Sequence, residues 1–219
     1  MRHAFPFIVS IYALGFFPLV VHAQEPALSF EQDPRPRNQR PDDYGYSGHI
    51  MSFIGVKNLD KNDWSPLENQ VEISLLLDGR ESSMPVNGVA DLRYSFDTGK
   101  SQGVSLKGST FELNLGVRKY FEFQTSGRRW SVSPFTPFIG GGLTLGYGEI
   151  EGTLGGITIK DTGYGVGFWI DGGALYTFEN GVSLGFEVGY SRLPVKFNDL
   201  GARADAGGLR FGIVIGYQF

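Results

Sequence analysis

The chain has 219 residues, with 32 Gly, 11 Pro, no Cys and a formal net charge of −4 at pH 7. The absence of cysteine excludes disulfides, dithiol redox pairs and thiolate metal sites. The acidic balance excludes a strongly basic nucleic-acid surface, so we expect no nucleic-acid partner. With 18 Phe and 10 Tyr, the sequence carries too much apolar area for a chain that stays disordered throughout.

The N-terminal segment predicts export. A short polar start precedes an apolar run, Ala4–Val21, which ends in short residues of the kind that a signal peptidase reads. A membrane anchor is the alternative, but two prolines interrupt the run and no basic cluster follows it. We therefore predict a signal peptide over residues 1–23. Residues 24–45 hold four prolines and few large apolar residues, so we expect a flexible linker before a folded domain over residues 46–219.

Within this domain, apolar and polar residues alternate with period two, which is typical of strands with two different faces. The last segment shows this best, because Leu209, Phe211 and Ile213 alternate with Arg210, Gly212 and Val214. A first strand, around residues 47–57, has no clear phase. In all we expect eight strands, the other seven lying around residues 71–77, 91–96, 111–118, 135–147, 164–178, 182–191 and 209–219.

The composition of the two faces predicts which one points inward. The polar faces consist mostly of Gly, Ser, Thr and isolated charged residues, which suits the narrow lumen of a small barrel. The apolar faces are then expected to point outward to lipid, as in a transmembrane barrel. A soluble sandwich with aromatic corners is the alternative. Aromatic residues near the strand ends favour the barrel, with one interface marked by Phe121, Phe135, Tyr176, Phe178, Tyr217 and Phe219, and the other by Phe96, Tyr147, Tyr164 and Tyr190.

The connections are expected to differ at the two ends of the barrel. Residues 179–181 contain Asn-Gly and predict a tight hairpin turn. Residues 57–67, 97–107, 150–163 and 193–206 are expected to be longer outer links, and residues 122–134 a long link at the opposite end. In the first outer link, Trp64 is expected to lie in the lipid headgroup layer, and the alternative is an anchor for a ligand.

Several motifs resemble the small OmpA/opacity-type family of outer-membrane β-barrels. They are Pro137–Leu143, Gly172–Tyr176, Asn180–Gly185 and the ending Arg210–Phe219. The resemblance implies an all-β, eight-stranded antiparallel up-and-down barrel in the outer membrane of a Gram-negative bacterium. It also implies that Tyr217 and Phe219 form the signal read by the barrel-assembly machinery during insertion. The family has many roles, so the resemblance does not fix one.

The candidate site is a network of charged residues inside the barrel. The phase of the strands places eight of them in the lumen, where charges of both signs are expected to pair because an unpaired buried charge is costly. Such a network would fill and stiffen the barrel, whereas a narrow small-solute channel lined by the same groups is the alternative. The eight residues are Glu72, Asp91, Arg93, Glu112, Arg118, Asp171, Glu187 and Arg210.

The sequence therefore predicts a structural or surface-interaction role and no enzyme. A lipid A-modifying activity is the remaining alternative, but His49 is the single histidine of the predicted mature chain, and we expect it at the rim of the barrel rather than acting as a base. No catalytic residue, cofactor or metal site is predicted. The expected partners are outer-membrane lipids, the barrel-assembly machinery, and an extracellular ligand or host surface that contacts the loops.

Overall fold

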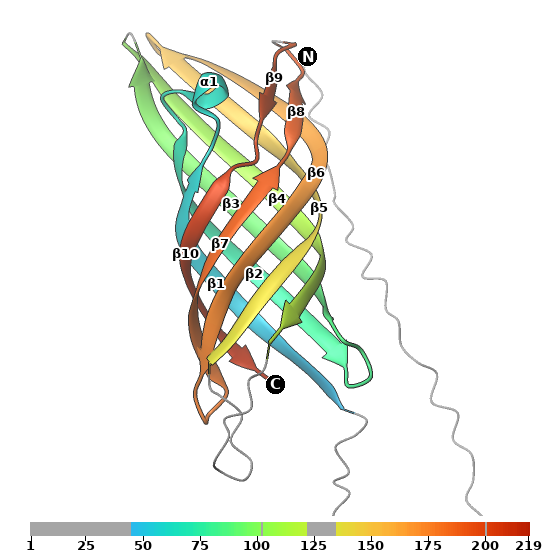
Figure 1. The fold of residues 1–219 in the computed structure, drawn as a ribbon. Coiled ribbons are helices and arrows are strands. Elements are labelled where there is room, and N and C mark those ends of the chain that lie inside the picture. Colours follow the sequence, from blue (N-terminus) through green and yellow to red (C-terminus); the bar gives the residue numbers. More distant parts are fainter. Residues whose placement is uncertain (1–44, 102, 122–134, 200) are drawn as a thin grey trace, which may run out of the picture. The chain divides into compact units, whose positions relative to one another are not determined.

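A computed structural model describes residues 45–101, 103–121, 135–199 and 201–219. All described residues belong to one compact unit. The predicted signal peptide, nearly all of the predicted linker and the link at 122–134 lie outside the described residues. The elements are β1 (Tyr46–Asn58), α1 (Lys61–Trp64), β2 (Asn69–Glu81), β3 (Asn87–Ser101), β4 (Val104–Tyr120), β5 (Phe135–Leu154), β6 (Ile157–Thr177), β7 (Val182–Arg192), β8 (Pro194–Phe197), β9 (Arg203–Asp205) and β10 (Leu209–Gln218) (Figure 1).

Eight of the strands form a closed antiparallel ring. Each of β1 to β6 pairs with the next strand in the chain, β7 pairs with β10, and β10 pairs with β1. The closing pair runs in register from His49 opposite Gln218 to Asn58 opposite Leu209. Two further hydrogen bonds join Gly48 and Phe219 in both directions, at 3.1 and 3.0 Å. The predicted eight-stranded up-and-down barrel is confirmed.

The turn between β6 and β7 is the tight hairpin that the sequence predicts. Gly181 adopts a φ of +84°, and its N–H donates to the carbonyl of Phe178 at 2.9 Å. Glycine suits this position because a side chain is strained at positive φ. The first and last strands both meet this end of the barrel, where the C-terminus lies (Figure 1).

Two of the predicted outer links are wrong, because the strands continue through them. β5 and β6 are 20 and 21 residues long and are joined by a two-residue turn, Gly155-Gly156. β3 and β4 likewise stay paired up to Ser101 opposite Val104. The polar composition of these segments is typical of loops. They keep the strand period, however, because Ile157 and Ile159 alternate with Thr158 and Lys160.

The link after β7 also contains structure that the sequence does not suggest. β8 pairs with both β6 and β9, and α1 lies in the first outer link. Figure 1 shows α1, β8 and β9 at the same end of the barrel, opposite the C-terminus. None of the helices among the described residues has the length and apolar character needed to cross a membrane.

Candidate functional site

The outer wall of the ring is apolar. Phe211, Ile213 and Ile215 of β10 are between 51 and 57% exposed, whereas the adjacent Val214 is 2% exposed. The same alternation runs through β2, where Val71, Ile73, Leu75 and Leu77 are exposed, and through the other long strands. It also settles the phase of β1, in which Ile50 and Ile54 are exposed while Met51 and Phe53 are buried.

The inside of the ring carries the charged residues. Arg93 is the centre of one part of this lumen network. Its guanidinium donates to Glu72 at 3.0 Å, to Glu187 at 2.5 Å and to Asp91 at 2.5 Å. The ring of Phe53 lies against the same guanidinium, 4.9 Å from centroid to Cζ. Three carboxylates thus compensate one buried cation, which holds β2, β3 and β7 to one another across the lumen.

Glu187 links this part to Arg118. The Arg118 guanidinium donates to Glu187 at 3.0 Å and also to Asp171. It lies over the ring of Phe138, 4.3 Å from the centroid. Arg210 completes the network, since its guanidinium lies 3.6 Å from Glu112 and 4.0 Å from Glu187.

All eight of the charged residues that the sequence places in the lumen are therefore buried and in contact with an opposite charge. The sequence does not place Lys57 there, because residue 57 falls in the first predicted outer link. Its ammonium is fully buried and donates to Glu112 at 2.5 Å, Thr110 at 2.8 Å and the carbonyl of Ala206 at 2.8 Å. The apolar residues at 54 and 56 could have revealed its inward phase.

The sequence predicts that His49 lies at the rim of the barrel, but in the structure it is buried. It is 7% exposed, and its Nδ1 lies 2.9 Å from Asp78 Oδ1. Asn87 and the hydroxyl of Tyr120 also donate to the Asp78 carboxylate. This cluster lies next to buried apolar side chains, which include Met51, Leu76, Val89, Phe138, Trp169 and Leu175. The lumen is thus partly apolar, although the sequence predicts small and polar residues there.

The sequence also predicts that Trp64 lies in the lipid headgroup layer, but in the structure it is buried. It is 1% exposed, and its indole N–H donates to the carbonyl of Asp205 at 2.8 Å. Its ring packs against Phe197 of β8, with 6.3 Å between centroids. Leu59, Leu193, Val195, Ala204 and Ala206 complete an apolar cluster. We call α1, β8, β9 and this cluster the plug, because they bury the Lys57 end of the lumen.

Chemistry inside the barrel is limited by these contacts. Among the described residues, no group of three His, Cys, Asp or Glu side chains is placed to hold a metal ion. His49 is oriented by Asp78, but no hydroxyl of a serine or threonine is hydrogen-bonded to it in the described part of the chain. The contacts of the described lumen residues are packing contacts and charge compensation.

A second polar feature lies on the outer wall, where the strands extend past the aromatic residues. Tyr94, Phe111, Tyr147 and Tyr164 are in register on β3, β4, β5 and β6, and we call them the aromatic row. Two residues further along each strand are Phe96, Ser109, Glu149 and Thr162, the polar row. Two residues beyond these lie Thr98, Lys107, Glu151 and Lys160, the charged row.

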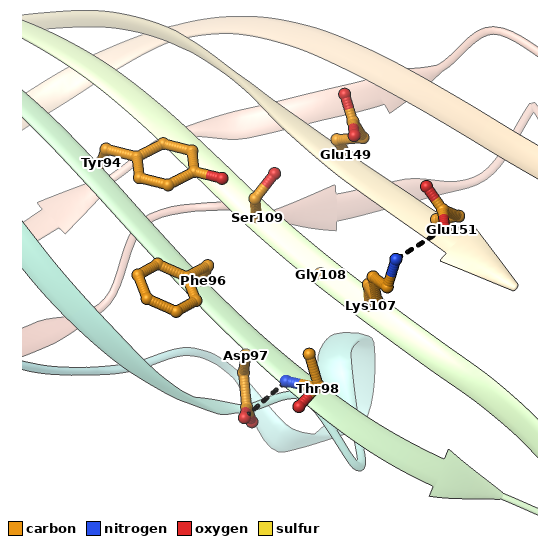
Figure 2. A pocket seen from close by; sticks show the side chains of 9 residues that line it. All are labelled: Tyr94, Phe96, Asp97, Thr98, Lys107, Gly108, Ser109, Glu149 and Glu151. Carbon is orange, nitrogen blue, oxygen red and sulfur yellow. Dashed lines mark hydrogen bonds and ion pairs between the residues drawn. The ribbon is translucent and has the colours of Figure 1, made fainter.

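A shallow groove crosses these rows. Figure 2 shows the rings of Tyr94 and Phe96 on one side, with Glu149, Glu151 and Lys107 on the other. The two rings are stacked, with 5.8 Å between centroids. Lys107 Nζ lies 3.2 Å from Glu151, and Lys160 Nζ lies 2.8 Å from Glu149. The groove therefore joins an apolar floor to a set of exposed charges.

The predicted assembly residues lie on the outer wall. Tyr217 and Phe219 are 49 and 59% exposed. The Phe219 ring nonetheless covers Gly48, because a Cβ added to Gly48 would lie 3.0 Å from it. Tyr217 similarly packs on Gly181, where a Cβ would lie 2.9 Å from the ring. Phe219 thus contacts a glycine of β1 at the closing seam of the barrel, and Tyr217 contacts the glycine of the turn between β6 and β7.

An apolar outer wall with aromatic rows, around a closed polar lumen, is the arrangement of outer-membrane β-barrels. The fold is of that class. Similar solved structures include Neisserial surface protein A (14% identity, TM-score 0.48, 80% of this chain and 97% of that chain). Another is Ail, the attachment invasion locus protein of Yersinia pestis, with 13% identity and a TM-score of 0.49 over 80% of this chain and 99% of that chain. A third is the outer membrane protein OprG from Pseudomonas aeruginosa, with 15% identity and a TM-score of 0.49 over 81% of this chain and 97% of that chain. No family model matches the sequence, and no curated protein matches it.

Proposed function

We propose that this barrel has a structural or surface-interaction role in the outer membrane and is neither a channel nor an enzyme. The observation that carries the proposal is the filling of the lumen at three levels. The apolar cluster around Trp169 occupies one level, the ion pairs of Arg93, Arg118 and Arg210 occupy the next, and the plug lies at the third. Eight strands leave an interior that side chains can fill, so this packing supports a closed barrel.

Electrophysiology tests the closed lumen. The purified chain, folded into planar lipid bilayers, is expected to give no stepwise ion current. The same preparation must show heat-modifiable mobility in SDS gels, which reports a folded barrel. Stepwise currents that change in amplitude in the Glu112→Gln variant would contradict the proposal, because such currents would pass through the lumen network.

A cellular comparison tests the role itself. Cells that lack the chain are expected to differ from the parent in detergent sensitivity or in binding to surfaces. Uptake of small solutes is expected to stay the same. A change in solute uptake alone would favour the channel instead.

The narrow channel remains the second candidate because of one observation. In the part of the chain that the structure describes, Arg210 Nε, Nη1 and Nη2 are buried without a hydrogen-bond partner. Buried donors of this kind bind water. Water beside Arg210 would hydrate the middle of the lumen, but the plug and the apolar cluster lie on either side of it.

An enzymatic role has less support. His49 contacts Asp78 and the ring of Tyr120, whose centroid lies 4.8 Å from its own. A lipid-modifying enzyme needs an activated nucleophile beside such a histidine. If His49 is structural, the His49→Ala variant should leave the lipid composition of the cells unchanged.

A further inference from the structure

We propose that the lumen network binds one small monovalent cation of the sodium class, held by the carboxylates of Glu72 and Asp91 and by the side-chain oxygen of Asn114. This inference goes beyond the proposed role, because it concerns what the closed lumen encloses. It rests on the sum of the buried charges, on their local pairing, and on buried oxygen atoms that accept no hydrogen bond.

The buried charges of the lumen network do not cancel. Among the described residues, the buried lysine and arginine side chains are Lys57, Arg93, Arg118 and Arg210, whereas the network contains the carboxylates of Glu72, Asp91, Glu112, Asp171 and Glu187. Asp78 and Asp161 are buried elsewhere, the first beside His49 and the second against backbone N–H groups, and neither supplies positive charge. Because an uncompensated buried carboxylate is costly, the network needs one further positive charge.

The surplus of negative charge is located at Glu72 and Asp91. Both carboxylates contact the Arg93 guanidinium, at 3.0 and 2.5 Å, and Arg93 also donates to Glu187. The other carboxylates are better compensated, since Glu187 contacts two further arginines, and Glu112 contacts a lysine and an arginine. A cation close to Glu72 and Asp91 would therefore supply the charge that Arg93 alone does not.

Oxygen atoms without hydrogen bonds lie on the same inner face as these two carboxylates. In the described part of the chain, Glu72 Oε2, Asp91 Oδ1 and Asn114 Oδ1 are buried and have no hydrogen-bond partner. Asp91 lies directly opposite Asn114 in the β3–β4 pairing, and the amide nitrogen of Asn114 is 3.4 Å from the other oxygen of Asp91. The hydroxyl oxygens of Ser74 and Thr144 are in the same condition, and Thr144 lies opposite Asn114. The set consists of oxygen atoms, which hard cations prefer as ligands.

A monovalent cation satisfies this set better than a proton or a water molecule does. Water can donate to the unpaired oxygen atoms, but it brings no charge. A proton on Glu72 or Asp91 would balance the charge and leave the Asn114 oxygen without a donor. One cation does both, because it neutralises the surplus and takes several oxygen ligands at once. A divalent cation would turn a surplus of one negative charge into a surplus of one positive charge.

Retention of sodium tests the site directly. The urea-unfolded chain is folded into micelles of an uncharged detergent in radiolabelled sodium chloride, and gel filtration then removes the free sodium. The plug and the apolar cluster around Trp169 lie on either side of the network, so we expect about one sodium ion to stay with each folded chain and to leave on unfolding. A parent chain that shows heat-modifiable mobility but retains no sodium would overturn the cation site.

The dependence of stability on sodium is a second, independent measurement. Sodium chloride is replaced by tetramethylammonium chloride at constant ionic strength, and urea unfolding is followed by heat-modifiable mobility. A single site that exists only in the folded chain raises the ratio of folded to unfolded chains by up to about tenfold for each tenfold increase in sodium. A ratio that is the same in both salts would mean that a proton balances the network, and would overturn the proposal.

The Asp91→Asn variant removes the surplus charge, while its amide oxygen can still accept a hydrogen bond from Arg93. It should retain no sodium, and in tetramethylammonium chloride it should be at least as stable as the parent. If Asp91 served only as an ion-pair partner of Arg93, the variant would be less stable than the parent in both salts. That result would contradict the cation site.

A second variant and a control complete the test. Asn114→Leu keeps the approximate volume but removes the amide oxygen, so it should retain at most about a tenth of the sodium that the parent retains. The matched control is Glu179→Gln, which removes one negative charge from the exposed turn after β6 and should retain as much sodium as the parent. Equal retention by the Asp91, Asn114 and Glu179 variants would overturn the assigned site.

Conductance is measured on the same preparations, so that the two proposals can fail separately. Stepwise currents through the lumen would contradict the proposed function. A folded, non-conducting barrel that retains no sodium would overturn this inference alone.

Discussion

The outer wall and the lumen are built from alternate residues of the same strands. The contribution of a lumen side chain to stability depends on the side chains around it much more than that of a wall side chain does. On the wall, Ile213 points outward and is exposed, so its contribution follows from its own apolar area. In the lumen, Arg93 is compensated by three carboxylates on three strands, and Glu187 is shared between Arg93 and Arg118. A substitution on the wall therefore acts locally, whereas a substitution in the lumen leaves several other charges without compensation.

The largest effect is expected from Arg93→Met. The variant keeps much of the side-chain volume but removes the cation between Glu72, Asp91 and Glu187. Removing one partner of a buried ion pair typically destabilises a protein by about 3–5 kcal/mol. Urea unfolding of the barrel in lipid vesicles, followed by heat-modifiable mobility, measures this loss.

Arg192→Met is the matched control for Arg93. Its side chain is 63% exposed and lies 3.7 Å from Asp205, so its removal should change stability by less than about 1 kcal/mol. Equal stability of the Arg93 and Arg192 variants would show that the lumen charges do not act as a network.

A somewhat smaller effect is expected from Ile213→Arg. Ile213 is 57% exposed in the middle of β10, where a charge would enter the hydrocarbon. An arginine near the bilayer midplane costs about 2–4 kcal/mol. The same unfolding measurement tests this, with Ser83→Arg in the exposed turn after β2 as the control. If both arginines were tolerated equally, the outward assignment of this face would be wrong.

Deletion of Phe219 should affect delivery more than stability. The loss of one large apolar side chain is expected to cost about 1–3 kcal/mol, here by uncovering Gly48 at the β1–β10 seam. If Phe219 is also the assembly signal, less protein should reach the outer membrane in cells, while the purified chain still folds into micelles. Equal outer-membrane amounts of the deletion and the parent would contradict the assembly role.

The smallest effect on the barrel is expected from Trp64→Ala. Trp64 packs on Phe197 and is hydrogen-bonded to Asp205, so its removal should loosen the plug. The eight ring strands pair with one another without the plug, so we expect the loss to be confined to local opening of the plug. Global unfolding should then change by less than about 1 kcal/mol. Hydrogen exchange in β8 and β9 should accelerate by about tenfold or more, as expected for such a segment. Unchanged exchange there would mean that Trp64 does not hold the plug.

Much of the wall can be predicted from the sequence because alternation is a local property. Ile73 and Leu75, or Phe211 and Ile213, indicate their outward phase without reference to any other strand. The Asn180-Gly181 turn is predictable for the same reason, since its conformation depends on two adjacent residues. The inward phase of the eight predicted lumen charges follows directly from these patterns, as does the number of strands in the ring.

The tertiary structure decided which residues meet. Glu187 joins Arg93 and Arg118 because the ring closes and its strands are tilted, which the sequence of a single strand does not specify. The sequence predicts a loop at Lys57 and Trp64 because their neighbours in the sequence are mostly polar. In the structure both side chains are buried, and they donate hydrogen bonds to Thr110, Asp205 and Ala206, which are distant in the sequence. In β1, Met51 and Phe53 point inward and belong to one buried apolar cluster with Leu76 and Phe138. Alternation determined the two faces of each strand, and ring closure determined what each inward residue contacts.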